Sequence, residues 1–440
     1  MPTDAPTFNL KAVVRETGLK PDTIRAWERR YGVPKPERTP GRHRLYTQHD
    51  IDLLKWMNAR QHEGMSISRI VDMWKSLEAE GKNPLQMTAH GPSAKATPLG
   101  DVGELANLRR DWVTACLQFA ESLAEQAVSQ AFALFPLDNV VIDVLLRGLS
   151  DIGEGWYRGD ITVQQEHFAS TLIVRRLNAL IASCPAPTRA ERIVLASPPD
   201  EQHTVSLHVI NLFLRRQGWP VIDLGANVPF DRLEKVLTSI RPQLVIAAAQ
   251  HLPTAQTLQA MADMVTRLHI PFAFGGGIFN RHPDLPDHIA GHFLGEELTG
   301  LTRAVQTILH APWPLQPAIE TPQDYLAAAQ HYEERLPQLE TELTAQLDGT
   351  AREAVQRAGA NAYLALYITA ALRLGDINFL DADLEWIRGL IAAQRLPDEA
   401  LYHYLRAYRT AAQKHLDRQG TIILEWFRRV LEELGETTES

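Results

Sequence analysis

The chain has 440 residues, 45% of them hydrophobic and 22% charged, with a formal net charge of −9. This composition is typical of soluble globular protein, and it excludes a mainly disordered chain, collagen and a coiled-coil rod. Two cysteines are too few for a disulfide scaffold or a Cys-rich zinc module, and no apolar run approaches the roughly 18 residues of a membrane span.

The N-terminal part differs from the rest of the chain in charge. Residues 1–46 hold ten Lys/Arg and five Asp/Glu, a net charge of +5, so the remainder carries −14. A basic head on an acidic body indicates an anionic partner for the head alone. The start lacks the basic and apolar regions of a signal peptide, so we expect a cytoplasmic protein with no membrane partner.

Residues 1–80 predict a helix-turn-helix followed by a wing. Leu10, Val13 and Val14 mark the core face of a first helix, and Trp27 is expected in the core of a second. A helix in the major groove with a basic wing on the flanking backbone is a known way to read duplex DNA. Arginines then supply phosphate contacts and guanine readout.

The same segment closely resembles the winged helix-turn-helix of the MerR regulator family, through RAWERRYG, PERTPGRHRLY and EGMSISRI. The resemblance implies a double-stranded DNA operator as partner and a homo-oligomer, a dimer or a tetramer. It also implies eight DNA-facing residues on the second helix and the wing: Arg25, Arg29, Arg30, Tyr31, Arg42, His43, Arg44 and Tyr46. The alternative is a solvated arginine face on an unrelated helical unit.

The rest of the chain divides by pattern. Residues 81–104 collect Gly, Pro, Ser and Thr and predict a linker, and 105–186 have the apolar spacing of a helical bundle. Residues 187–311 alternate short β-branched runs with helix-length segments, which predicts a Rossmann-like, doubly wound parallel sheet of about five strands. A Pro-rich linker, 312–322, precedes a C-terminal all-α bundle over 323–440. The sequence therefore predicts a multidomain α and α/β protein with four folded units.

A group of polar residues follows the first strand of the predicted sheet. The motif Glu201-x-His203-x-x-Ser206 lies at the edge where doubly wound sheets bind ligands. A histidine there can ligate a metal through a neutral ring nitrogen, and a neighbouring acid can hold its other N–H. Small residues at 275–277 allow a ligand to approach the backbone. These residues alone predict a ligand site of unknown type.

The helical bundle, the sheet and the spacing of Trp156 to Glu166-His167 together resemble the cobalamin-binding module of methionine synthase type. Joined to the basic head, residues 1–311 resemble the CarH/CarA/LitR light-responsive repressors. The resemblance implies adenosylcobalamin or another cobalamin, with His203 as the lower axial cobalt ligand. The other implied cofactor contacts are an upper-face set (Trp156, Glu166 and His167), the His203 partner Glu201, and a nucleotide-tail set (Ser206, Gly275, Gly276 and Gly277).

Three departures from the family pattern bear on this prediction. Ser206 replaces the motif glycine, and Ala247–Ala249 lies where many members place a Ser/Thr hydroxyl worth about 1 kcal/mol. Tyr157 replaces a histidine that captures cobalt after photolysis in light-sensing members. Cobalamin binding is retained as the prediction, and the lit state is expected to differ.

The C-terminal helices carry aromatic residues at helical spacing, which most often form a core. His403 and His415 offer an alternative, a site for a non-covalent bilin such as biliverdin. The favoured function is a cobalamin-dependent, light-responsive transcription regulator whose oligomeric state or DNA affinity follows the cobalt upper ligand. The alternative is a bilin or haem sensor with a vestigial cobalamin module. The sequence has no G-x-S-x-G, P-loop or H-E-x-x-H motif, so we expect no enzyme.

Overall fold

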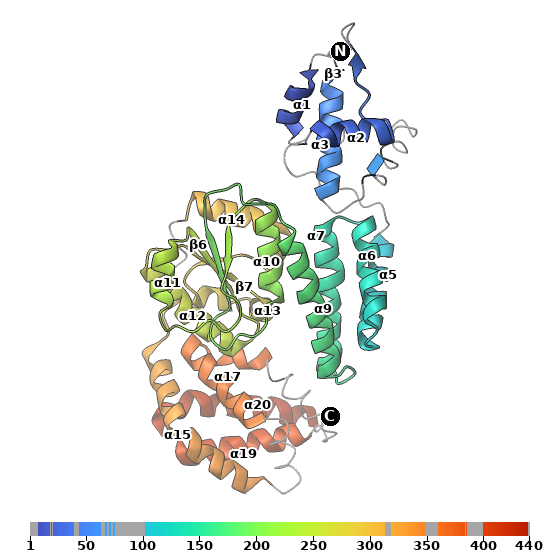
Figure 1. Cartoon of the computed structure of the whole chain (residues 1–440). Helices are drawn as coiled ribbons and strands as arrows, with labels where there is room; N and C mark the ends of the chain where they lie inside the picture. Colours follow the sequence, from blue (N-terminus) through green and yellow to red (C-terminus); the bar gives the residue numbers. More distant parts are fainter. Residues whose placement is uncertain are drawn as a thin grey trace. The chain divides into compact units, whose positions relative to one another are not determined.

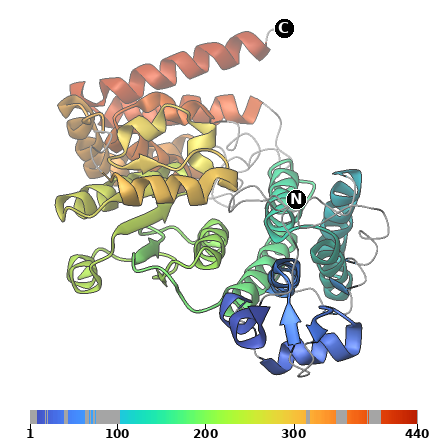
Figure 2. The same ribbon diagram turned by 90° about the horizontal axis from the view of Figure 1, so that it is seen from above.

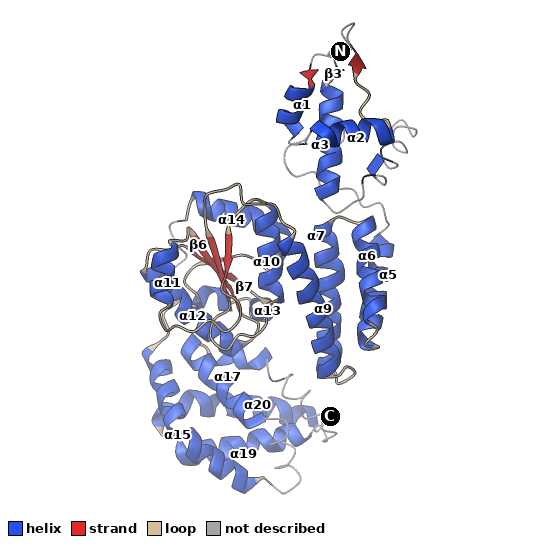
Figure 3. Ribbon diagram, viewed as in Figure 1, coloured by secondary structure: helices blue, strands red, loops and turns tan. Residues whose placement is uncertain are grey.

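The computed structural model describes residues 8–17, 19, 21–38, 44–62, 67, 70, 71, 74, 102–312, 318–347, 360–382, 384 and 399–438. The chain divides into two compact units (Figure 1), one formed by 1–111 with 125–144 and the other by 112–124 with 145–440. Helices dominate both units, and the second contains a parallel sheet (Figure 3). Among the described residues, no helix combines the length and apolar character that a membrane span requires.

The described part of the head contains helices and a small antiparallel sheet of order β1-β3-β2. Its elements are β1 (Phe8–Asn9), α1 (Leu10–Thr17), α2 (Pro21–Tyr31), β2 (Glu37–Arg38), β3 (Arg44–Tyr46) and α3 (Gln48–His62). Val13, Ile24 and Trp27 are buried in its core, which confirms the predicted helix-turn-helix and the core position of Trp27. Strand β1 was not predicted; it pairs Phe8 with Tyr46, and this pairing ties the start of the head to the wing strand.

The segment between head and sheet is helical, as predicted. Its elements are α5 (Val102–Leu117), α6 (Glu121–Leu134), α7 (Leu137–Asn139), the π-helix η2 (Val140–Leu146), α8 (Arg147–Tyr157) and α9 (Val163–Ala182). Thr162 and Gln165 form a capping box that starts α9. The Gln165 side chain also donates to the carbonyl of Leu117 at 2.7 Å, and Arg175 pairs with Glu121 at 2.7 Å. These contacts fix α9 against the turn after α5.

The sheet of the second unit has five parallel strands in the order β5-β4-β6-β7-β8, which confirms the predicted doubly wound architecture. The strands are β4 (Ile193–Ala196), β5 (Val221–Asp223), β6 (Leu244–Ala248), β7 (Phe272–Gly275) and β8 (His292–Phe293). The connecting helices are α10 (Val205–Arg216), α11 (Leu233–Ile240), α12 (Leu252–Arg267), α13 (Gly277–Arg281) and α14 (Leu301–His310). Helices α11 and α12 bury one face of the sheet, and α10 packs with β4, β6 and α14. The carboxyl ends of β4, β6 and β7 therefore meet at one edge.

The described part of the C-terminal region is helical, as predicted. It consists of α15 (Gln323–Gln346), α17 (Ala360–Leu374), the 3-10 turns η5 (Ile377–Leu380) and η6 (Arg418–Gly420), α19 (Glu399–His415) and α20 (Thr421–Thr438). Figure 2 shows these orange and red helices gathered into one group. The 3-10 turn η6, which ends at Gly420, separates α19 from α20.

One hydrophobic core crosses the predicted boundary at 312–322. Helix α17 packs against α12, and the buried cluster runs from Leu258 and Met261 into Ile368 and Leu372. Phe379 of η5 lies edge-on to the rings of two histidines that precede β8, His282 and His288, with ring centroids 5.6 and 5.3 Å away. The C-terminal helices and the sheet thus share a core within one compact unit.

Three tyrosines of the C-terminal core predict a loss of stability in alkali. Tyr332, Tyr404 and Tyr408 are buried, and burial raises the pKa of each above the ordinary value of tyrosine. Their stabilising contribution is complete below the unfolded-state pKa of about 10 and is lost as pH rises toward the folded-state pKa. The free energy of unfolding should therefore fall by about 1.4 kcal/mol per pH unit for each buried phenol above that point.

The variant Tyr404→Phe tests this expectation. Within the described residues the Tyr404 hydroxyl is buried without a hydrogen-bond partner, so its removal should raise the free energy of unfolding at pH 7 by about 1 kcal/mol. It should also reduce the alkaline slope by about 1.4 kcal/mol per pH unit in urea denaturations between pH 7 and 11. The control Tyr402→Phe changes a half-buried phenol on the same helix. An equal effect of both variants would contradict the account.

Candidate functional site

The loop after β4 positions a buried carboxylate at the sheet edge. Asp200 has a φ of 68°, and its N–H donates to the Asn227 side chain at 2.8 Å. The Asn227 N–H in turn donates to the Glu201 carbonyl at 2.9 Å. These bonds hold the turn that directs Glu201 inward, where its side chain is fully buried.

Four hydrogen bonds saturate the Glu201 carboxylate. Oε1 accepts from the backbone N–H of His203 at 2.8 Å and lies 2.7 Å from His203 Nδ1. Oε2 accepts from the Gln250 N–H and the Thr254 hydroxyl, both at 2.7 Å. Burial would raise the pKa of Glu201, but the bonds from His203, Thr254 and Gln250 outweigh it and hold the pKa below its ordinary value. We call these four residues the Glu201 cluster.

The Glu201 cluster presents His203 to solvent with one ring nitrogen held. Because Nδ1 faces the carboxylate, a neutral His203 carries its lone pair on Nε2. The side chain is 58% exposed, although its partner Glu201 is buried. The bond to Glu201 raises the pKa of His203 above its ordinary value, and the charge of Glu166 adds to the effect. The ring also lies edge-on to His251, with centroids 4.9 Å apart.

Gln250 joins the predicted nucleotide-tail residues to the Glu201 cluster. Its side-chain amide donates to the Ser206 hydroxyl at 3.3 Å and accepts from the Gly277 N–H at 3.0 Å. Gly276 has a φ of 123°, and a Cβ there would stand 2.0 Å from the Ala249 carbonyl oxygen. Gly275 has open space where a Cβ would stand. Gly276 is therefore required by backbone packing, whereas Gly275 leaves room at the edge.

The predicted upper-face residues lie on α8 and α9. Trp156 is half-buried in the last turn of α8. Glu166 Oε2 lies 2.7 Å from Nδ1 of the exposed His167 in the first turns of α9. Glu166 acts on the pKa of His203, so the start of α9 lies within electrostatic range of the Glu201 cluster. In the described part of the chain, no hydrogen bond or ring contact joins Trp156 to His203.

Two members of the Glu201 cluster were not found by sequence reasoning. Thr254 and Gln250 flank the start of α12, some fifty residues after Glu201 in the chain. A local signal was present, because the His251-x-x-Thr254 spacing forms a capping box directly after a buried strand.

The recognition helix α2 exposes the predicted arginines. Arg25, Arg29 and Arg30 are exposed, and the Arg30 guanidinium lies 5.6 Å from the ring centroid of the half-buried Tyr31. Three arginines on one helix face supply both charge and hydrogen-bond donors for a phosphate backbone.

The wing differs in part from expectation. Tyr46 is fully buried because its ring fills the core of the head, so its role is packing rather than DNA contact. Arg44 Nε donates to Glu28 Oε2 at 2.8 Å, which raises the pKa of Arg44 and ties the wing strand to α2. Arg42 and His43 lie outside the described residues.

Comparison with known proteins gives two family matches. Residues 8–77 match the MerR HTH family regulatory protein model, and residues 108–181 match the B12 binding domain model. The chain is 30% identical over 302 residues to the HTH-type transcriptional repressor CarH of Myxococcus xanthus, spanning 66% of this chain and 96% of CarH. The chain belongs to the CarH family of repressors. It thus joins a MerR-type DNA-binding head to a B12-binding domain.

Two further relatives match parts of this chain. The CarH-type chain is 29% identical over 271 residues to the repressor CarA of Myxococcus xanthus, spanning 60% of this chain and 84% of CarA. It is 27% identical over 109 residues to the methanol–corrinoid protein of Methanosarcina barkeri, spanning 24% of this chain and 42% of that protein. About a third of this CarH-type chain lies outside the match to CarH.

The chemistry of His203 and its partner Glu201 fits a residue that binds the cobalt of a B12 cofactor. A single exposed imidazole with its Nδ1 held by a buried acid is the arrangement that orients a metal-binding histidine and raises its basicity. The open space at Gly275 and the polar pair Ser206–Gln250 lie at the same sheet edge.

Proposed function

We propose that the protein is a cobalamin-dependent, light-responsive transcription regulator. The observation that carries the proposal is the Glu201 cluster, which fixes His203 at the ligand-binding edge of a sheet in a chain with a MerR-type head. His203 would hold the cobalt through Nε2, and Glu201, itself bonded to Thr254, would orient the imidazole. When bound, the cobalamin supplies a light-sensitive cobalt–carbon bond.

The remaining residues hold the two ends of the cofactor. Trp156, Glu166 and His167 would bind the side of the cofactor that carries the adenosyl group. Ser206 and Gly275–Gly277 would bind the nucleotide tail. Gln250 spans Ser206 and Gly277, so its side chain must move aside or bind the tail directly.

Light changes DNA binding through assembly. A ligand shifts an equilibrium only by its different affinity for two states, so Trp156 and its helix must contact the cofactor differently before and after light. A dimer or tetramer binds repeated operator sites more tightly than a monomer because of avidity. A change in assembly alone therefore alters the occupancy of the operator. The head supplies the DNA contacts through Arg25, Arg29 and Arg30.

One experiment tests the whole proposal. The full chain is mixed with adenosylcobalamin in the dark, and absorption, molar mass by size-exclusion light scattering, and operator affinity are measured before and after illumination. The proposal predicts a bound corrin spectrum, and a change in both mass and operator affinity with light. A bound corrin without either change would retain cobalamin binding and remove the light response.

The double variant Arg29→Gln, Arg30→Gln should weaken operator binding about ten- to a hundredfold at fixed salt, because two exposed guanidiniums leave the recognition helix. The slope of log affinity against log salt should fall by about 2 if both contact phosphates. The matched control, Lys55→Gln, removes a charge on α3 that pairs with Glu16 on α1. Unchanged operator affinity in the double variant would exclude this end of α2 from the interface.

A further inference from the structure

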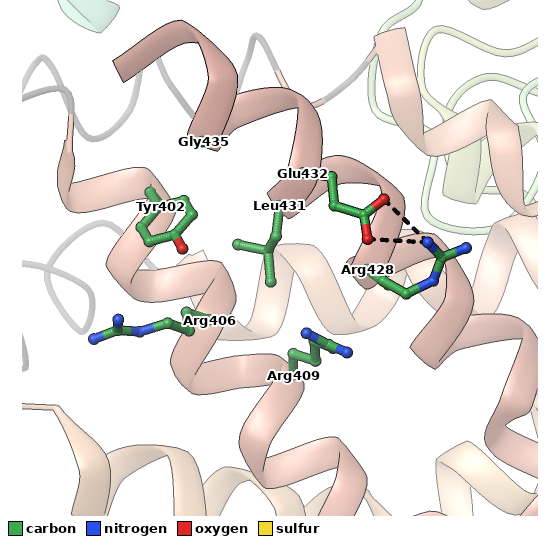
Figure 4. A pocket seen from close by; sticks show the side chains of 7 residues that line it. All are labelled: Tyr402, Arg406, Arg409, Arg428, Leu431, Glu432 and Gly435. Atoms are coloured by element: carbon green, nitrogen blue, oxygen red, sulfur yellow. Dashed lines mark hydrogen bonds and ion pairs between the residues drawn. The ribbon is translucent and has the colours of Figure 1, made fainter. Parts of the chain in front are cut away.

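Two of the C-terminal helices form an open, arginine-lined pocket that no role above explains. It has a volume of about 420 Å³ and lies between α19 and α20 (Figure 4). Its walls are formed by Tyr402, Arg406 and Arg409 from α19 and by Arg428, Glu432 and Gly435 from α20. We call this feature the arginine pocket.

Helical spacing brings these side chains to one place. Tyr402, Arg406 and Arg409 follow each other at four and three residues, and so share one face of α19. Arg428, Glu432 and Gly435 have the same spacing on α20. The opposite face of α19 carries Tyr404 and Tyr408, which are buried in the core, so the helix that lines the pocket is packed against that core.

Gly435 keeps the space beside Tyr402 open. A Cβ at this position would lie 4.0 Å from Tyr402 Cε2, and no closer atom stands in the way. A larger side chain would project into the pocket without a change of charge. The absence of a side chain at this point therefore contributes to the volume.

The charge of the pocket is unbalanced. Arg428 Nη1 donates to both oxygens of Glu432 at 3.0 Å, so one arginine is neutralised (Figure 4). Arg406 lies over the Tyr402 ring, 5.9 Å from its centroid. Within the described residues, Arg406 and Arg409 form no hydrogen bond or ion pair with an acid, and the buried Arg409 Nε has no partner. Two arginines that line the pocket thus have donors that no described protein group accepts from.

We propose that the arginine pocket binds a phosphorylated small molecule of about nucleotide size. Guanidinium groups bind phosphate through paired, charge-assisted hydrogen bonds, and two free forks suit a group with several anionic oxygens. The volume lies in the range of small-ligand sites. The Tyr402 ring gives an apolar wall for the ligand body. None of the pocket residues belongs to the Glu201 cluster or to the head.

The test uses the full chain in titration calorimetry with pyrophosphate, ATP and citrate as probes. Pyrophosphate and ATP should bind, citrate should bind at least tenfold more weakly, and Arg406→Gln or Arg409→Gln should each weaken phosphate binding about tenfold or more. Gly435→Leu should weaken ATP binding by filling the pocket, and it favours the helix. The control Arg335→Gln removes an exposed charge from α15 and should leave binding unchanged.

Several outcomes would overturn the proposal. If none of the three probes produced heat of binding, the pocket would not be a ligand site. If citrate bound as tightly as pyrophosphate, the pocket would bind carboxylates as well as phosphates, and the proposed ligand class would be wrong. If Arg335→Gln weakened phosphate binding as much as the pocket variants, the effect would come from the overall positive charge and not from the pocket. Loss of operator affinity in Arg409→Gln, with no binding of pyrophosphate, would make the surface a DNA contact instead.

Discussion

The variant His203→Ala is expected to lose cobalamin affinity more than a hundredfold and to lack the spectrum of histidine-ligated cobalt. Removal of an orienting partner alone costs ten- to a hundredfold in metal sites, so loss of the ligand itself should cost more. The apoprotein should stay folded, because the His203 side chain is 58% exposed and contributes little to the core. Absorption titration with adenosylcobalamin in the dark measures the effect.

The matched control for this variant is His208→Ala. His208 lies on α10 five residues after His203. Its Nδ1 contacts the Thr204 carbonyl at 2.8 Å, and among the described residues it forms no hydrogen bond with the Glu201 cluster. It should bind cobalamin with normal affinity and spectrum. If His203→Ala bound cobalamin as tightly as the parent and with the same spectrum, the assignment of His203 as the cobalt ligand would be wrong. This conclusion would not depend on the operator affinity of the variant.

Patterns within one segment predicted the fold well. All five strands of the sheet were predicted because each is a short apolar run between helix-length segments, and buried parallel strands have this pattern. The shared core of α12 and α17 could not be predicted, since a Pro-rich segment marks a linker and says nothing of which helices pack across it.

The candidate site was predicted only where its residues are close in the chain. Glu201 and His203 lie two residues apart, so their pairing was visible as a motif. Thr254 and Gln250 reach the same carboxylate only because parallel strands β4 and β6 are neighbours in the sheet. Tyr46 was predicted to contact DNA because of its position in the wing. Its strand pairs with Phe8 and its ring is buried in the core, a long-range effect that the local sequence does not reveal.

The variant Glu201→Ala is expected to lower the free energy of unfolding of the apoprotein by about 3 kcal/mol or more. Three donors, the N–H groups of His203 and Gln250 and the Thr254 hydroxyl, lose a buried acceptor, and each orphaned donor costs about 1–3 kcal/mol. Thr254 keeps a second bond to the His251 carbonyl at 3.0 Å, which limits its share. Cobalamin affinity should also fall about ten- to a hundredfold, because His203 remains but is no longer oriented.

Hydrogen exchange locates this effect and separates it from general unfolding. The amides of His203 and Gln250 should exchange faster in Glu201→Ala, while those of the head keep the parent rate. The control Asp200→Asn removes the adjacent exposed charge and leaves the carboxylate bonds intact. Because the pKa of Glu201 is lowered, its contribution is complete above the unfolded-state pKa of about 4.3 and is lost as pH falls through the folded-state value. Below about pH 4, the difference in free energy of unfolding between the parent and Glu201→Ala should therefore shrink. If this difference stayed the same at low pH, the Glu201 side chain would stabilise the sheet edge by packing rather than by its charge.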